Sequence, residues 1–278
     1  MLPILLGLAS ALAWGTGDFA GGLASRKVGP YRAVMFAEAI GLGAVLFIVP
    51  FFPESLPDLR SVLWSILAGV IGSSGLIAFF EAMRRGRLSV VAPLSALLGA
   101  VVPVVIGSFI DGLPKASVFG GVALAWLAIV LISREKVPED EEKSAPYLHI
   151  PILAGIAFGL YFVLMHEAGR DFFWGPLIIA RTAGMLAIAL FLLIQRGDFS
   201  VPSGSWHLLA VNGIFDVGGN AFYLLATQAG RMDVSAVLGS LYPGMTVFLA
   251  WLILKEKLQI TQWIGILIAL FAIILMTI

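Results

Sequence analysis

Hydrophobic residues fill long, nearly continuous stretches of this chain, and short polar or helix-breaking segments separate them. About 20 apolar residues in a row can cross a bilayer as a helix, which satisfies its own backbone. The strands of a membrane barrel would alternate apolar and polar residues instead. Pro93, Pro103 and Pro243 are expected to interrupt the fourth and ninth helices, since proline lacks a backbone donor. The ten predicted transmembrane helices are approximately 3–24, 31–52, 61–83, 89–110, 116–133, 148–167, 175–195, 205–228, 234–254 and 260–278.

The composition supports this pattern. Sixty per cent of the 278 residues are hydrophobic and 12% are charged, whereas soluble proteins average about 45–50% and about 25%. The formal net charge is 0, so no basic surface for nucleic acid is expected. The first stretch lacks the basic segment of a signal peptide and is interpreted as a span. We predict an all-α integral membrane protein, multi-pass, in the inner cell membrane.

The two halves of the chain repeat each other, because a shift of 144 residues aligns 61–134 with 205–278 without a gap. The matched residues include Gly69 with Gly213, Gly75 with Gly219, and Gly86-Arg87 with Gly230-Arg231. We predict a first five-helix repeat at 1–133, a charged linker at 134–147 and a second repeat at 148–278. Because five is an odd number, the second repeat is expected to be inverted, as in many secondary transporters. The alternative is a duplication retained only for packing.

Charged residues are rare within the predicted helices, where they are costly and commonly functional. Asn212, Asp216 and Asn220 are four residues apart and share one face of a helix, and Trp14 and Asp18 have the same spacing. Such stripes suit a cavity for a small polar solute; the alternative is hydrogen bonding between helices. The predicted solute-binding residues are Asp216, Asn212, Asn220, Asp18, Trp14, Arg181 and Tyr242.

The intramembrane charges leave two questions open. Asp18 and Asp216 can bind an amine or hold a proton, and Glu38 is a third candidate for proton coupling. Arg181 can bind a carboxylate in a two-pronged contact, or it can pair permanently with Glu38 on the symmetry-related second helix.

Several segments have a distinctive sequence. They are Trp14-Gly15, Gly86-Arg87-Leu88-Ser89-Val90-Val91-Ala92-Pro93-Leu94, Gly230-Arg231-Met232-Asp233-Val234-Ser235-Ala236-Val237-Leu238, Ser240-Leu241-Tyr242-Pro243 and Leu254-Lys255-Glu256-Lys257-Leu258. Together they resemble the EamA-type members of the drug/metabolite transporter (DMT) superfamily, over the whole chain as two repeats. The resemblance implies ten helices, alternating access and the transport of small metabolites, often amino acids exported from bacteria. The first repeat departs from the pattern at Gly99 and at Asp111-Gly112-Leu113-Pro114, where the second has Pro243 and the Lys-Glu-Lys hairpin.

We therefore predict a secondary transporter that exports a small organic metabolite, an amino acid or a similar amphipathic solute. Its expected partners are this solute, the lipid bilayer and, as a coupling option, protons, with the chain as a monomer or homodimer. No cofactor, metal or nucleic acid is expected. The first alternative is a non-transporting scaffold or receptor.

An intramembrane protease is the second alternative. Gly15-Thr16-Gly17-Asp18 fits the GxGD pattern of aspartyl proteases, which need a second aspartate on a preceding helix. Gly72-Ser73-Ser74-Gly75 fits the GxSG pattern of rhomboid-type serine proteases, which need a histidine deep in another span. The three histidines, His149, His166 and His207, all fall at span ends. We therefore expect no enzymatic activity.

Lysine and arginine are unevenly divided between the two sides of the predicted bundle. The loops that follow the odd-numbered helices hold twelve of them and the other loops hold four. The positive-inside rule places the first set in the cytoplasm and both termini outside, whereas the family resemblance implies cytoplasmic termini. Both orientations stay open.

Overall fold

The computed structural model of the protein describes residues 1–85, 88–110, 112–113, 115–132, 149–255 and 259–277. Within these ranges every regular element is a helix. The α-helices are α1 (Leu2–Val28), α2 (Pro30–Ile48), α3 (Leu59–Arg85), α4 (Leu88–Ile110), α5 (Ala116–Ile132), α6 (His149–Ala168), α7 (Trp174–Ile194), α8 (Trp206–Ala229), α9 (Met232–Gly239), α10 (Tyr242–Leu254) and α11 (Ile260–Thr277). The predicted linker 134–147, Gly86-Arg87, Asp111, Pro114 and Glu256-Lys257 lie outside the described residues.

Seven helical segments in the described part of the chain are long and apolar enough to cross a membrane. They are Leu2–Val28, Pro30–Phe51, Leu59–Arg84, His149–Ala168, Trp174–Ile194, Ser203–Ala229 and Met232–Ile253. Shorter apolar stretches lie in α4, α5 and α11, at Ser95–Phe109, Ala116–Leu131 and Trp263–Ala272. The prediction of an all-α chain with many apolar helices is confirmed.

The ninth predicted span is divided into α9 and α10. The division falls at Ser240 and Leu241, directly before Pro243. Proline has no N–H to donate to the carbonyl four residues earlier, and the amide of Leu241 donates to the carbonyl of Leu238, three residues back, at 3.1 Å. The chain therefore tightens at this point and restarts as α10 with Tyr242 as its first residue.

The prolines of α4 have a different outcome. The helix runs without a break from Leu88 to Ile110, through Pro93 and Pro103. The expectation that these two prolines interrupt the fourth helix is wrong, because only Pro243 coincides with a division of its helix.

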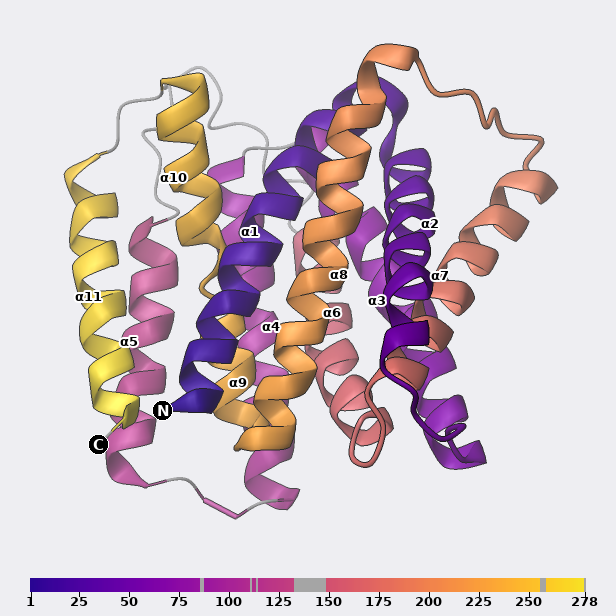
Figure 1. Cartoon of the computed structure of the whole chain (residues 1–278). Helices are drawn as coiled ribbons and strands as arrows, with labels where there is room; N and C mark the ends of the chain where they lie inside the picture. Colours follow the sequence, from indigo (N-terminus) through magenta and orange to yellow (C-terminus); the bar gives the residue numbers. More distant parts are fainter. Residues whose placement is uncertain (86–87, 111, 114, 133–148, 256–258, 278) are drawn as a thin grey trace.

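Helices from the two halves of the chain pack in matching pairs. α1 packs on α8 and α6 packs on α3; α2 packs on α8 and α7 packs on α3. Exchanging the halves (α1 with α6, α2 with α7, α3 with α8) turns each pair into the other. α5 and α11 lie side by side at one end of the bundle, and α2 and α7 lie near the other end (Figure 1). Both chain termini lie at the same end of the helices (Figure 1).

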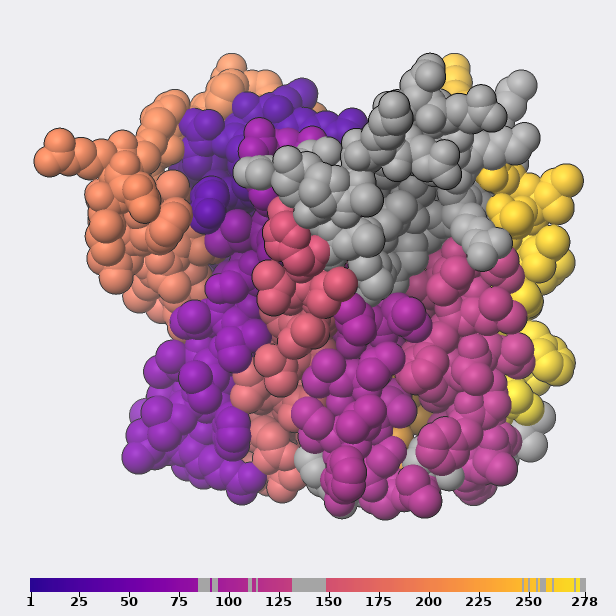
Figure 2. Space-filling view, turned by 180° about the vertical axis from the view of Figure 1, so that it is seen from behind, coloured from indigo at the N-terminus to yellow at the C-terminus, as the bar shows by residue number. Residues whose placement is uncertain are grey.

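Apolar side chains cover the outside of the bundle. Seen from behind, the lower part of the surface is formed in turn by α3, α6 and the α4–α5 pair, with α11 at the edge (Figure 2). Large exposed hydrophobic residues recur on these helices, including Leu63 and Leu67 of α3, Leu153 of α6 and Leu267 of α11. A surface of this kind is stable against lipid tails rather than against water.

Two glycines related by the sequence repeat allow neighbouring helices to approach closely. A Cβ at Gly69 of α3 would lie 2.0 Å from the carbonyl oxygen of Ala180 on α7. A Cβ at Gly213 of α8 would lie 2.5 Å from the carbonyl oxygen of Ala37 on α2. Small residues at helix crossings are typical of membrane proteins, where close backbone packing replaces the hydrophobic effect. This packing holds α2 close to α8 and α7 close to α3.

Candidate functional site

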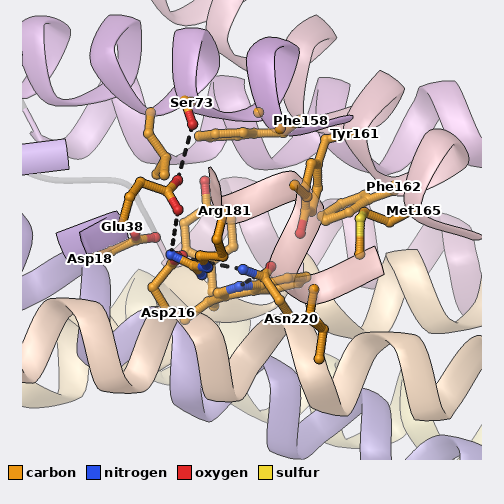
Figure 3. A pocket seen from close by; sticks show the side chains of 17 residues that line it. Asp18, Glu38, Ser73, Phe158, Tyr161, Phe162, Met165, Arg181, Asp216 and Asn220 are labelled. Atoms are coloured by element: carbon orange, nitrogen blue, oxygen red, sulfur yellow. Dashed lines mark hydrogen bonds and ion pairs between the residues drawn. The ribbon is translucent and has the colours of Figure 1, made fainter. Parts of the chain in front are cut away.

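A cavity lies between helices of both halves of the chain (Figure 3). Its empty space amounts to about 660 Å³, including the space at its mouth. Helices α1, α2 and α3 of the first half and α6, α7, α8 and α10 of the second contribute the lining residues. These are Trp14, Asp18, Glu38, Gly69, Gly72, Ser73, Leu76, Phe158, Tyr161, Phe162, Met165, Leu177, Ala180, Arg181, Asp216, Asn220 and Tyr242.

Arg181 of α7 joins two carboxylates inside the cavity. Its Nη1 donates to Oε2 of Glu38 on α2 at 2.8 Å, and its Nη2 donates to Oδ2 of Asp216 on α8. Ser73 of α3 donates its hydroxyl to the other oxygen of Glu38 at 3.0 Å. Arg181 is 3% exposed, so the guanidinium is held almost entirely by protein groups. Both terminal nitrogens are therefore committed to partners within the chain.

A second set of hydrogen bonds positions Trp14. The indole Nε1 of Trp14 on α1 donates to Oδ1 of Asn220 on α8 at 3.1 Å. The amide nitrogen of Asn220 in turn lies 3.5 Å from Oδ2 of Asp216, at the outer limit for a hydrogen bond. The indole ring is thus fixed through α8 next to the buried ion pairs.

Two buried residues of the cavity, Asp18 and Tyr242, carry polar groups without such a partner. Asp18 of α1 is 8% exposed and makes no hydrogen bond or ion pair with any residue that the structure describes. The hydroxyl of Tyr242, at the first position of α10, is buried and likewise lacks a hydrogen-bond partner among the described residues. An unpaired polar group in an apolar interior costs free energy. Asp18 and Tyr242 are therefore the candidates for a ligand contact in this cavity.

Aromatic rings form the opposite side of the cavity. Figure 3 shows Tyr161, Phe162 and Met165 of α6 across from Asp18 and Glu38. Phe162 stacks on Trp14 with ring centroids 5.2 Å apart, and Tyr223 lies 4.9 Å from Phe162. The Tyr223 hydroxyl donates to the backbone carbonyl of Phe162 at 2.8 Å, which ties α8 to α6. The cavity is thus polar and acidic on one side and aromatic on the other.

Most of the residues that the sequence predicts for the site meet in this cavity. Asp18, Trp14, Arg181, Asp216, Asn220 and Tyr242 all line it, together with Glu38. Asn212 is not among the lining residues and packs near Gly17 and Gly21 of α1. Its position is explained by the helix geometry, because eight residues along an α-helix amount to a rotation of about 80° away from Asn220. Which lining residues bind solute stays a prediction.

Sequence reasoning did not select Phe158 and Phe162 of α6. The repeat contains the signal, because the shift of 144 residues places Trp14 on Phe158 and Asp18 on Phe162. The same shift places Gly72 on Asp216 and Leu76 on Asn220, and all eight of these residues line the cavity. At three of the four pairs the two repeats contribute side chains of different polarity from equivalent positions, and at Trp14 and Phe158 both contribute an aromatic ring.

The fold and this cavity define a multi-pass membrane protein with a buried polar site between two helical halves. The EamA-like transporter family matches residues 1–134 and 147–278. The chain therefore belongs to the EamA-like transporter family, as its sequence motifs predict, and this is a family of transporters. No curated protein matches the chain.

One solved structure, described as "Crystal structure of protein", is similar to this chain. The similarity covers 99% of this chain and 96% of that one, with 16% sequence identity and a TM-score of 0.80. At this identity the likeness concerns the fold alone.

Proposed function

We propose that the protein is a secondary transporter that moves a small amphipathic organic metabolite across the membrane by alternating access. The observation that carries this proposal is the cavity, which is lined by three helices of one repeat and four of the other. Secondary transporters bind their solute at this kind of interface between repeats. Export across the inner cell membrane is the proposed direction, in accordance with the EamA resemblance.

An inverted arrangement of two five-helix repeats supports alternating access, because two equivalent halves can exchange their roles at the two membrane faces. The packing of α1 on α8 and of α6 on α3, which is preserved when the halves are exchanged, fits this arrangement. Both termini lie at the same end of the helices, which fits an even number of membrane crossings. We propose ten crossings, with α9 and α10 forming the ninth and α4, α5 and α11 spanning as well.

The proposed site of coupling to protons is Asp18 rather than Glu38 or Asp216. Both of the latter carboxylates form ion pairs with Arg181. Asp18 lines the same cavity without an ion pair among the described residues. A group that gains and loses a proton during transport needs to be free of a permanent counter-charge.

The test is a flux measurement in proteoliposomes, with Leu76→Trp as the blocking variant. Leu76 lines the cavity on α3. The indole ring of a tryptophan at this position would fill space that a solute needs. Leu63 lies on the same helix with 54% of its surface exposed on the outside of the bundle, so Leu63→Trp is the matched control. A panel of radiolabelled metabolites is followed with and without a pH gradient.

We expect flux of at least one solute in the wild type and in Leu63→Trp, and a loss of about tenfold or more in Leu76→Trp. Monodisperse elution and an unchanged melting temperature show that each variant is folded. Equal flux in Leu76→Trp and the wild type excludes this cavity as the solute path. Absence of flux for every solute supports a scaffold or receptor instead.

A further inference from the structure

We propose that the solute of this cavity is a monocationic amine with an apolar body and without a carboxylate. Its ammonium group binds at Asp18 and Tyr242, and its apolar part lies against the aromatic side chains of α6. The transport of such an amine rests on the function proposed above, whereas its binding can be tested separately.

The charges of the cavity favour a cation. Asp18, Glu38 and Asp216 contribute three carboxyl groups, and Arg181 is the one cationic side chain among the described lining residues. With all four ionised the formal charge of the cavity is −2. Burying uncompensated charge is costly in a low-dielectric site. One ammonium group bound at Asp18 halves this charge.

The same charges disfavour a carboxylate on the solute. The only described guanidinium in the cavity donates one terminal nitrogen to Glu38 and the other to Asp216. A carboxylate on the solute would need to displace one of these partners and leave it buried and unpaired, which costs several kcal/mol in comparable buried pairs. A zwitterionic amino acid therefore gains an ammonium contact but finds no free cationic side chain among the described lining residues.

The division between α9 and α10 places a tyrosine in the same cavity as this carboxylate. Pro243 forces the helix to restart, so that Tyr242 begins α10 and lines the cavity with its buried hydroxyl unpartnered. The hydroxyl of Thr246, one turn later on α10, donates to the carbonyl of Gly15 at 3.2 Å, which holds α10 against α1 near Asp18. A tyrosine hydroxyl accepts a hydrogen bond from an ammonium group. Asp18 and Tyr242 together therefore provide two acceptors for one cationic head.

The aromatic side chains of the cavity indicate the chemistry of the remaining part of the solute. Phe158, Tyr161 and Phe162 of α6 line the cavity, and the face of Trp14 stacks on Phe162. Aromatic faces bind apolar groups and attract cations through the ring quadrupole. The Trp14 N–H is already donated to Asn220, so the indole ring has no hydrogen bond left for a charged group of the solute. The solute is therefore expected to carry its charge at one end only.

Three compounds with the same ring test this proposal: 2-phenylethylamine (cation), phenylalanine (zwitterion) and 3-phenylpropionate (anion). Binding to the purified full-length protein is measured by isothermal titration calorimetry, and flux is measured in proteoliposomes. We expect 2-phenylethylamine to bind at least about tenfold more tightly than phenylalanine, as one unmatched buried charged contact predicts. The anion is expected not to bind.

Two substitutions assign the ammonium contact. Asp18→Asn is expected to weaken amine binding about tenfold or more, whereas Asp171→Asn, in an exposed turn, is the matched control and leaves binding unchanged. Tyr242→Phe removes a hydroxyl that has no described partner, so the melting temperature of the unliganded protein should stay the same or rise. Its amine affinity should nevertheless fall several-fold, which a purely structural role of the hydroxyl does not explain.

The outcomes separate this proposal from the proposed function. If phenylalanine binds as tightly as 2-phenylethylamine, or if none of the three compounds binds, the amine proposal is overturned. Unchanged amine binding in a folded Asp18→Asn variant overturns it as well. If the amine binds but no solute of the panel crosses the membrane, the amine site stands and the transport function fails.

Discussion

Nη1 of Arg181 lies 2.8 Å from Oε2 of Glu38, and this ion pair joins α7 of the second repeat to α2 of the first. The same guanidinium reaches Asp216 on α8. The sequence is compatible with two roles for Arg181, which are contact with a solute carboxylate and a permanent ion pair within the protein. Its two ion pairs favour the second alternative, and the guanidinium then organises the carboxylates around the cavity instead of binding a solute carboxylate.

Replacing Arg181 by methionine should be strongly destabilising. The substitution leaves Glu38 and Asp216 buried side by side without a counter-charge, and breaking a buried pair in this way costs about 3–5 kcal/mol. Arg181→Lys should recover part of the loss, because one ammonium replaces the charge but not the two-pronged contact. Thermal unfolding of detergent-purified protein measures the difference.

The control for this prediction is Arg60→Met. Arg60 forms an ion pair with Glu167 at 2.7 Å, but its side chain is 59% exposed. An exposed pair contributes about 0–1 kcal/mol. Equal destabilisation by the two substitutions would show that the charges around Arg181 are solvated rather than buried.

The repeated glycine crossings predict a second pair of stability changes. Gly213→Ala places a methyl group 2.5 Å from the carbonyl oxygen of Ala37, so α2 and α8 must separate. Overpacking of this kind costs about 1–3 kcal/mol. Gly218→Ala on the same helix meets no atom within 4 Å, and the higher helix propensity of alanine makes it neutral or stabilising by up to about 1 kcal/mol. Melting temperatures that fall equally in both variants would contradict the crossing.

Much of the fold follows from the sequence because lipid imposes strict rules on it. Long apolar runs predict helices, and the repeat predicts which helices are equivalent. The division of the ninth span between α9 and α10 was signalled by Pro243, but the continuity of α4 through Pro93 and Pro103 was not. A proline in the sequence shows that one backbone hydrogen bond is lost. Whether the helix continues through it depends on how neighbouring helices compensate for that loss, which the sequence does not show.

The site was less predictable than the helices. Helical periodicity placed Asp216 and Asn220 on one face, and both line the cavity. The same rule included Asn212, which packs against α1 instead. Whether Arg181 pairs with Glu38 or contacts a solute could not be predicted, because this depends on how closely α2, α7 and α8 pack against one another. Only a three-dimensional arrangement shows that one guanidinium satisfies two carboxylates.

Asp198 follows the end of α7 and pairs with Arg32 in the first turn of α2. The contribution of Asp198 to the stability of the fold should depend on pH in a defined direction. Hydrogen bonds from the hydroxyl and the backbone N–H of Ser200, with the Arg32 guanidinium 3.0 Å away, hold the pKa of the Asp198 carboxyl below its ordinary value of 3.8. A lowered pKa stabilises the fold above pH 3.8, and this contribution is lost as the pH falls through the lowered pKa. The melting temperatures of the wild type and Asp198→Asn should therefore differ by a constant amount between about pH 5 and pH 8. A difference that shrinks within this range would contradict the assignment.

Amine binding at Asp18 should weaken as the pH falls. A proton and an ammonium group compete for the same carboxylate, and the affinity for 2-phenylethylamine can fall by at most about tenfold per pH unit where one proton is exchanged for one amine. The other titratable or charged groups that line the cavity around Asp18 are Glu38, Tyr161, Arg181, Asp216 and Tyr242. Glu38 and Asp216 are paired with Arg181, so the competition is expected to belong to Asp18. Calorimetric titrations from about pH 8 down to about pH 4, the ordinary range of a carboxyl group, should show this trend in the wild type and in Asp171→Asn, and Asp18→Asn should remove it. A trend that persists in Asp18→Asn assigns the proton to another carboxylate and separates amine binding from any coupling through Asp18.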